Sequence, residues 1–337
     1  MVIGDVSAPP EEVAAPEVPA EAEAGEGVDA PEEPEAQAQA DETQPSRPAA
    51  PTEGPPRPSA LVIVLAFVLF ASVVVAFLGV FAFGLSGLQE HRSQQQLYAR
   101  FRGLLAPASL VAPSTGGVIP ADTPVALLNA PAAGIHDVVV VEGTSSGDLL
   151  QGPGHLADTP LPGQGGEAVL VGKSTTAGAP FADLARLRKG DLLTVRTGQG
   201  LFRFTVEGLL APGTHQPAIR ANRGRLVLVT SAGAGGVGGL EPSQTVGIEA
   251  TLKGKAVVAP PHRPEKVPLS DVPGQSDPAA WPFVGLWLGG LVVASAAVWW
   301  LWARLGILRT WLIGAPVLLA LLWGLSNEAM RLLPNTY

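Results

Sequence analysis

Three stretches of the chain are apolar over enough positions to cross a membrane. Residues 60–88 and 279–303 contain no charged side chain, and residues 310–327 form a shorter uncharged stretch. A helix needs about 20 apolar residues to span the hydrocarbon core of a bilayer. The pattern therefore predicts three transmembrane helices, at 60–88, 279–303 and 307–327. The last is also compatible with an interfacial or core helix, because its length is marginal.

Between the first two apolar stretches the pattern changes to short runs of Val, Leu and Thr separated by Gly, Pro and Asn. These runs cover residues 138–142, 168–171, 191–196, 202–209, 226–230 and 245–252. Such spacing favours an all-β barrel or sandwich over a parallel sheet with crossover helices. One helical pattern interrupts it at 179–187, with Pro180 in the first turn and Lys189-Gly190 as a stop.

These patterns divide the chain outside the membrane into three parts. We expect a β domain over residues 108–255, which is long enough for one hydrophobic core. A helical linker at 89–107 would join it to the first span. A Pro-rich, extended linker at 256–278 would join it to the second.

The charge is concentrated at the amino terminus. Residues 1–59 contain 14 acidic side chains but only Arg47 and Arg57 as basic ones, whereas the remainder carries 19 basic and 16 acidic side chains. The segment has too little apolar surface to offset its ordering entropy, so it is predicted to be a disordered acidic tail. The net charge of −9 therefore says nothing about an acidic site elsewhere.

Basic residues beside the spans predict the orientation. The first span is longer than the roughly 7–15 apolar residues of a cleaved signal peptide, so we interpret it as a retained anchor. Arg57 precedes it, and Arg304 and Arg309 flank the turn between the other two spans. The positive-inside rule then places the amino terminus in the cytoplasm and residues 89–278 outside.

A glycine-rich segment suggests a nucleotide site at first sight. The apolar run 226–229 leads into Gly233-x-Gly235-x-x-Gly238, the spacing of a dinucleotide-binding turn. That turn must open a helix whose amino end faces the pyrophosphate. Here Pro242 and another predicted strand follow instead. We therefore interpret the segment as a flexible connection between strands and expect no nucleotide.

Other chemistry is limited by composition. The chain has no cysteine, which excludes disulfides, a thiolate nucleophile and cysteine-ligated metals. A basic group in the β domain suits an acidic peptide or wall polymer, or is simply solvated; it comprises Arg220, Arg223 and Arg225. The histidines lack metal-binding spacing, so no zinc or other metal, no cofactor and no nucleic acid are expected; they are His91, His136, His155, His215 and His262.

Several motifs occur in an order that resembles the sortases, particularly their class E-like, actinobacterial group. They are Asp148-Leu-Leu-Gln-Gly-Pro-Gly-His155, Pro160-Leu-Pro-Gly-Gln-Gly-Gly166, Ala168-Val-Leu-Val-Gly172, Gly178-Ala-Pro-Phe-Ala-Asp-Leu184 and Leu187-Arg-Lys-Gly-Asp191. The resemblance covers roughly residues 115–252. It implies an all-β fold with an eight-stranded barrel and short helices, anchored to the outer face of the membrane. It also implies a Cys that attacks a sorting-signal peptide, a His in proton transfer and an Arg that steadies the oxyanion.

The positions that match these three residues carry different side chains. Lys173 stands in the place of the His, Ser231 in that of the Cys, and Gln244 (or Thr245, if the loop is counted differently) in that of the Arg. A Ser hydroxyl needs a base before it can attack. Removing one oxyanion donor typically costs about 10² to 10³ in rate. We therefore expect a degenerate sortase that has lost cysteine transpeptidation.

One enzymatic alternative stays open. Lys173 and Ser231 occupy positions that face each other in the family. A desolvated Lys with a lowered pKa can accept the proton of a Ser. The alternative function is thus a serine hydrolase or transpeptidase built on a sortase barrel.

These observations predict a multi-pass membrane protein with an extracytoplasmic, sortase-like domain. We expect this domain to be a pseudoenzyme, inactive as a cysteine transpeptidase. Its expected role is peptide binding or assembly of the cell envelope and its surface proteins. The expected partners are the membrane and either a surface-protein peptide or other envelope membrane proteins. The paired, Trp-rich carboxyl-terminal helices support the assembly role, because one anchor is enough to tether an enzyme.

Overall fold

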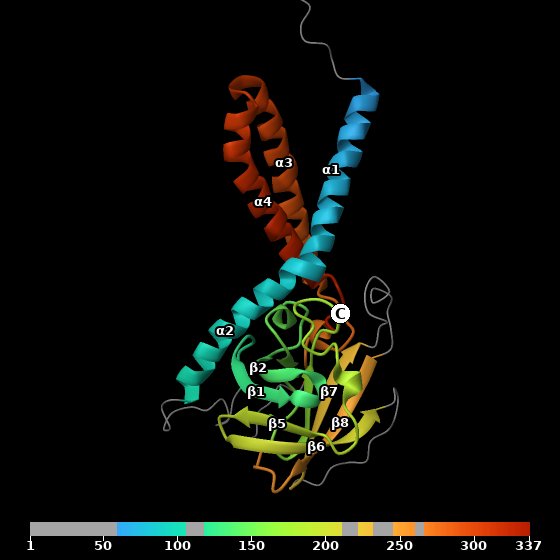
Figure 1. Cartoon of the computed structure of the whole chain (residues 1–337), viewed down its shortest axis with the longest axis vertical. Helices are drawn as coiled ribbons and strands as arrows, with labels where there is room; N and C mark the ends of the chain where they lie inside the picture. Colours follow the sequence, from blue (N-terminus) through green and yellow to red (C-terminus); the bar gives the residue numbers. More distant parts are fainter. Residues whose placement is uncertain (1–58, 106–117, 211–221, 232–244, 260–265) are drawn as a thin grey trace, which may run out of the picture. The chain divides into compact units, whose positions relative to one another are not determined.

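The computed structural model describes residues 59–105, 118–210, 222–231, 245–259 and 266–337 (Figure 1). Residues 58–337 form one compact unit. It combines a closed β-barrel with four long helices. Apart from Ser59, the predicted acidic tail lies outside the described residues.

Eight strands close the barrel, which confirms the expected fold class. Their order around it is β1-β2-β3-β4-β7-β8-β6-β5. The β2–β3 and β4–β7 pairs are parallel and the other pairs are antiparallel. The strands are β1 Pro124–Ala130, β2 Ile135–Glu142, β3 Gly154–His155, β4 Gly166–Val171, β5 Leu192–Thr197, β6 Gly200–Leu210, β7 Gly224–Ser231 and β8 Thr245–Lys253.

The barrel interior is filled by aliphatic side chains and phenylalanine. Alternation along the strands delivers them: in β5, Leu193 and Val195 are fully buried while Leu192 is exposed. Because side chains of a strand point to opposite faces in turn, one apolar residue in two is enough to line the core. Other fully buried members of this core are Leu128, Leu170, Phe204, Leu226 and Ile248.

The helix predicted at 179–187 is wrong. Only a short 3-10 helix, Leu184–Arg186, forms there, and the backbone of Leu187 is already extended. Tertiary contacts override the local propensity. Phe181 is fully buried and its N–H donates to the carbonyl of Lys173, which pins the segment to the end of β4. A Cβ at Gly172 would lie 2.5 Å from the Phe181 ring. The ring can therefore pack against the backbone at position 172 only because that residue is glycine.

The strands beside the glycine-rich segment are antiparallel. β7 and β8 pair directly, from Arg225 opposite Thr251 to Ser231 opposite Thr245. A dinucleotide-binding unit requires parallel strands joined by a helix. The glycines at 233–238 themselves lie outside the described residues.

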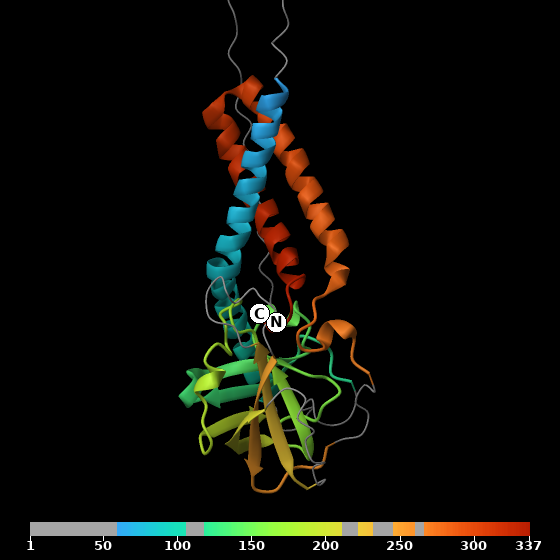
Figure 2. The same cartoon turned by 90° about the vertical axis from the view of Figure 1, so that its right-hand side faces the viewer.

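Three helical segments are long and apolar enough to span a membrane, judged by length and composition: Ala60–Leu105, Pro278–Leu305 and Ile307–Arg331. The first consists of α1 Ala60–Val80 and α2 Ser86–Leu105, joined without a break by a π-helical turn at Phe81–Leu85. The others contain α3 Trp281–Leu305 and α4 Ile307–Arg331. Gly306, at φ 79°, makes the tight turn between α3 and α4. In Figure 2 this hairpin lies beside α1.

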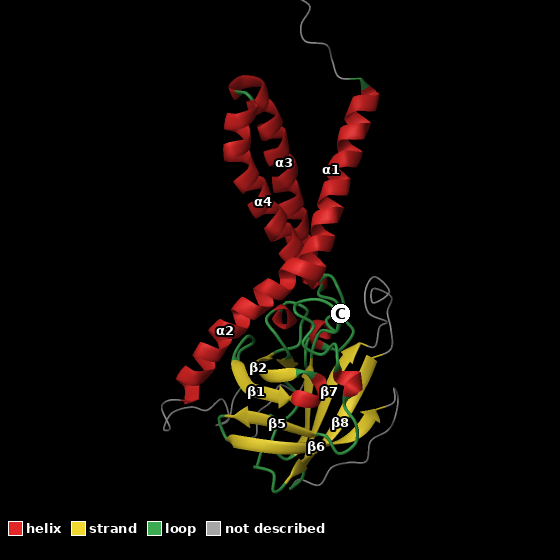
Figure 3. Ribbon diagram, in the orientation of Figure 1, coloured by secondary structure: helices red, strands yellow, loops and turns green. Residues whose placement is uncertain are grey.

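Apolar clusters hold these helices together and to the barrel. Val74 of α1, Leu291 of α3 and Leu322 and Leu325 of α4 form one buried cluster. A second joins Phe81 and Met330 to Leu150 and Ala177 in loops of the barrel. Figure 3 shows that the helices within the barrel domain are only short turns.

The α2 helix docks directly on β2. The Gln94 side-chain amide donates to the carbonyls of Val139 and Gln151 and accepts from the N–H of Val139, at 2.8–3.0 Å. Leu97 of α2 is buried against Val139 and Val141. The predicted linker after residue 88 is therefore part of one continuous helix that contacts the barrel along its outer surface.

Candidate functional site

The fold brings Lys173 and Ser231 to the same end of two neighbouring strands. β4 and β7 are parallel, with Val171 opposite Val229, so the residues that follow them stand at matching levels. The N–H of Gly172 donates to the carbonyl of Val229, and the Thr230 hydroxyl donates to the carbonyl of Gly172. The third matched position, Gln244, lies outside the described residues.

Lys173 directs its side chain into the protein interior. It is completely buried, and its Nζ lies 3.3 Å from Ser146 Oγ, to which it donates. The Ser146 hydroxyl in turn donates to the carbonyl of Met330 at the end of α4, at 3.0 Å. Desolvation disfavours the ammonium form and lowers the pKa of Lys173 to about 7.

Ser231 makes its hydrogen bonds to other partners. Its Oγ lies 2.7 Å from Ser174 Oγ and 2.9 Å from the carbonyl oxygen of Thr336. Among the described residues, Ser231 is not hydrogen-bonded to Lys173. The two matched positions thus lie side by side in the backbone, but their side chains belong to different hydrogen-bond networks.

The residues that follow α4 occupy this site. We call residues 332–337 the post-α4 segment, and the surroundings of Ser231 that contact it the Ser231 site. The Thr336 carbonyl oxygen receives the N–H of Ser174 at 3.1 Å, the Ser174 hydroxyl at 3.2 Å and the Ser231 hydroxyl. The Thr176 hydroxyl donates to the carbonyl of Tyr337 at 2.6 Å. Backbone hydrogen bonds therefore hold the segment at the carboxyl ends of β4 and β7.

Asn335 is held by its side chain. Its Nδ2 donates to the carbonyls of Thr144, Ser270 and Val272 at 2.7, 3.3 and 3.1 Å, and its Oδ1 accepts from the N–H of Gly274 at 2.7 Å. The residue is fully buried. One amide therefore links the barrel, the linker before α3 and the post-α4 segment.

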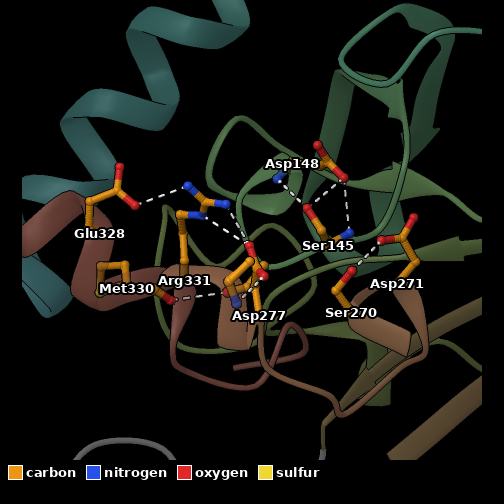
Figure 4. Close-up of polar contacts among 10 residues, drawn as sticks. Ser145, Asp148, Ser270, Asp271, Asp277, Glu328, Met330 and Arg331 are labelled. Atoms are coloured by element: carbon orange, nitrogen blue, oxygen red, sulfur yellow. Dashed lines mark hydrogen bonds and ion pairs between the residues drawn. The ribbon is translucent and has the colours of Figure 1, made fainter. Parts of the chain in front are cut away.

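The linker is also tied to the end of α4 (Figure 4). Arg331 pairs with Asp277 through Nη2 at 2.6 Å and with Glu328 through Nη1 at 3.0 Å. The N–H of Asp277 donates to the carbonyl of Arg331. The Thr144 hydroxyl bonds the carbonyl of Asp271 at 2.6 Å. Residues 271–277 of the predicted linker therefore contact both the end of α4 and the loop after β2.

The loop between β2 and β3 supplies further contacts and carries a buried carboxyl group. Asp148 accepts from the N–H and hydroxyl of Ser145 at 3.0 and 2.7 Å. Burial raises the pKa of Asp148 to about 6. The neighbouring Thr144 and Ser146 are fully buried. The carbonyl of Thr144 accepts from Asn335, and the hydroxyl of Ser146 accepts from Lys173.

His155 belongs to the barrel framework rather than to the Ser231 site. Its Nδ1 lies 2.7 Å from Oε2 of Glu142, and its Nε2 lies 3.1 Å from the carbonyl of Pro160. Both side chains are buried. The pair fastens the two-residue strand β3 to β2.

The basic group proposed from the sequence is partly neutralised. Arg225 pairs with Glu167 at 3.1 Å and with Glu249 at 2.8 Å, and only 13% of its side chain is exposed. Arg223 is exposed, and Arg220 lies outside the described residues. Arg225 thus acts as a cross-strand contact between β4, β7 and β8.

Most residues at and around the site carry no recognisable signal in the sequence. Ser146, Ser174 and Thr176 are ordinary polar loop residues in the sequence. Asn335 to Tyr337 follow an apolar helix without any periodic pattern. The only signal was the position of Ser174 beside Lys173 at the end of a predicted strand.

Comparison with known proteins relates the barrel to the sortases. Residues 128–233 match the family model described as Sortase domain. No curated protein matches the chain. The eight-stranded closed barrel is like that of sortases.

Solved sortase structures also match the chain. A sortase D5 transpeptidase of Clostridium perfringens is 18% identical, covers 49% of this chain and 98% of its own, and gives a TM-score of 0.38. For sortase E of Streptomyces avermitilis the values are 25%, 45%, 99% and 0.34. For sortase E1 of Streptomyces coelicolor, solved with a tripeptide in the active site, they are 21%, 44%, 93% and 0.32.

Proposed function

We propose that this chain is a membrane-anchored, extracytoplasmic sortase-like protein that binds a peptide at the Ser231 site without catalysing transpeptidation. The observation that carries the proposal is the Thr336 carbonyl oxygen, which receives donors from Ser174 and Ser231. These donors recognise peptide backbone rather than a particular side chain. Peptide binding of this kind suits a role in assembling surface proteins or the cell envelope.

The side chains favour binding over catalysis. A Cys is intrinsically nucleophilic, whereas a Ser hydroxyl requires a base within hydrogen-bond reach. The amine of Lys173 is hydrogen-bonded to Ser146 instead. The hydroxyl of Ser231 contacts the carbonyl oxygen of Thr336, as a donor in a binding site does.

The second candidate function is the serine hydrolase or transpeptidase that uses Ser231 and Lys173. The observation in its favour is the pKa of Lys173, which burial lowers to about 7. Such an amine is able to accept a proton at neutral pH. Its present partner, Ser146, would have to be exchanged for Ser231 before it could act as the base.

A fluorophosphonate probe separates the two candidates. We expect the probe to label the wild type no more strongly than Ser231→Ala or Ser174→Ala, because no base activates the hydroxyl of Ser231. The assay is repeated in a variant lacking residues 333–337, so that occlusion cannot explain a negative result. Labelling that disappears in Ser231→Ala but persists in Ser174→Ala would establish a serine enzyme.

Peptide binding is tested with the same truncated variant. A labelled synthetic peptide with the sequence of residues 333–337 should bind it saturably, and a scrambled peptide should not. Combining the truncation with Ser174→Ala should weaken binding several-fold, because a net hydrogen bond is worth about 1 kcal/mol. A folded truncated variant that binds neither peptide would refute the proposed function.

The proposed topology places the barrel outside and the turn between α3 and α4 inside. Arg304 and Arg309 beside this turn support it. So do the hydrogen bonds of the post-α4 segment to the barrel, because the α3–α4 hairpin must then return to the side it left.

The cysteine-free sequence makes this topology easy to test. The exposed residues Lys255 and Arg309 form a matched pair of basic positions. In intact cells, an impermeant maleimide should label Lys255→Cys fully and Arg309→Cys only after lysis. The reverse pattern would contradict the proposed orientation.

A further inference from the structure

We infer that the post-α4 segment is a built-in ligand of the Ser231 site, and that this site selects an Asn one residue before the carbonyl that it holds. An external peptide would then bind by displacing the segment. This inference rests on the proposed function and specifies its ligand: a peptide that forms a turn like that of residues 334–337 and carries a side-chain amide at the position of Asn335.

The Asn335 subsite requires a group that donates and accepts. Three carbonyls, of Thr144, Ser270 and Val272, face its nitrogen, and one N–H, of Gly274, faces its oxygen. A carboxylate has no donor for the three carbonyls. An aliphatic side chain would remove the partner of the Thr144 and Ser270 carbonyls and of the Gly274 N–H, whereas the Val272 carbonyl would keep the N–H of Gln275, at 3.1 Å. The Asn335 side chain is itself fully buried, so in this position its amide depends on these protein partners for its hydrogen bonds.

The next positions are recognised through the backbone. The carbonyls of Thr336 and Tyr337 accept from Ser174, Ser231 and Thr176. The N–H of Asn335 donates to the carbonyl of Gln275 at 2.8 Å. The N–H of Tyr337 donates to the carbonyl of Pro334 at 3.1 Å, so the segment forms a turn. Any peptide that forms this turn offers the same backbone groups, so the selectivity of the site resides in the amide subsite.

The segment has a short tether, which favours it over a free peptide. Arg331, at the end of α4, is fixed by Asp277 and Glu328, and the site begins four residues later. Attachment to a fixed helix end gives the segment a high effective concentration at the site. An external peptide must therefore compete with it, and weakening the segment should open the site.

Alkylation of a cysteine placed at 231 measures this opening. Ser231→Cys creates the single thiol of the chain and should react slowly with iodoacetamide in the full-length protein, because residue 231 is only 4% exposed. Adding Asn335→Ala should speed the reaction at least about tenfold, since each lost hydrogen bond shifts the ratio of open to closed molecules several-fold. Intact mass distinguishes alkylation from chain cleavage.

Two controls make the result specific. Asn129→Ala removes an amide that bonds Asp137 on the surface of the barrel and should leave the rate unchanged. In the Asn335→Ala background, added peptide with the sequence of residues 333–337 should restore protection, whereas the same peptide with Asp for Asn should not. An unchanged melting temperature excludes general unfolding as the cause.

The outcomes separate the two proposals. Fast alkylation of Ser231→Cys in the otherwise wild-type chain would overturn the built-in ligand, and peptide binding by the truncated variant would be unaffected by that result. Equal protection with and without Asn335→Ala would overturn the amide subsite. If alkylation behaves as expected but the truncated variant binds no peptide, the segment is a structural clasp and the proposed function fails.

Discussion

Replacing Lys173 by Met is expected to stabilise the protein at neutral pH. The lysine side chain is completely buried and burial lowers its pKa from 10.5 to about 7. Folding at pH 7 must therefore remove a proton that the unfolded chain holds, which costs roughly 4 kcal/mol. Met fills a similar volume without a charge. After subtracting the lost hydrogen bond to Ser146, we expect Lys173→Met to raise the free energy of unfolding at pH 7 by about 3 kcal/mol.

The pH dependence identifies the cause. Between pH 7 and 10.5 the unfolded state binds more protons at residue 173 than the folded state, so this residue makes stability rise with pH. Below pH 7 the free-energy cost of burying Lys173 no longer changes with pH. The advantage of Lys173→Met should therefore be largest at or below pH 7 and shrink toward pH 10.

Thermal unfolding of the full chain in detergent, followed from pH 6 to 10, measures this difference. At pH 7 we expect the melting temperature of Lys173→Met to exceed that of the wild type by about 5 °C or more. The control is Lys189→Met, because 79% of the Lys189 side chain is exposed; it should change little at any pH. A less stable Lys173→Met, or a difference independent of pH, would contradict the account.

The second large effect is expected from His155→Ala, in the opposite direction. The substitution leaves the Glu142 carboxylate buried in the barrel without its partner. Breaking a buried pair by removing one member typically costs about 3–5 kcal/mol. The loss also removes the side-chain contact between β3 and β2 and leaves only their backbone pairing, so the barrel should become markedly less stable.

Replacing both members tests the same explanation. The double variant Glu142→Leu and His155→Leu should lose less stability than the two single variants combined, because it leaves no unpaired buried charge. The exposed pair of Arg186 and Asp183 serves as the comparison, and Asp183→Ala should cost less than about 1 kcal/mol. Strictly additive effects in the buried pair would rule out the proposed coupling.

The fold was largely predictable because its strands carry apolar patterns. The runs at 168–171 and 226–230 became β4 and β7, whose parallel pairing defines the site. The strand β3 was beyond prediction because it has two residues. The helix expected at 179–187 was wrong because the buried Phe181 ring and its contact with Lys173 outweighed local propensity.

The site was only half predictable. Its two matched positions follow predicted strands, so the sequence located Lys173 and Ser231 but not the partners of their side chains. Ser146, which takes the amine, lies in a loop 27 positions before Lys173. The contacts of Asn335 and Thr336 with the barrel join residues 105 to 191 positions apart. No local periodicity records contacts of such separation.

The unbroken course from α1 into α2 has a mechanical consequence. At 1.5 Å per residue, the 46 residues of Ala60–Leu105 measure roughly 70 Å along the helix path, which bends between α1 and α2 (Figure 1). This is more than twice the roughly 30 Å of a hydrocarbon core. The α2 part of this helix is held to β2 by the hydrogen bonds of the Gln94 side chain. In the proposed topology a continuous helix, rather than a flexible linker, would join the membrane span to the barrel, and the helix would then set the distance of the barrel from the bilayer.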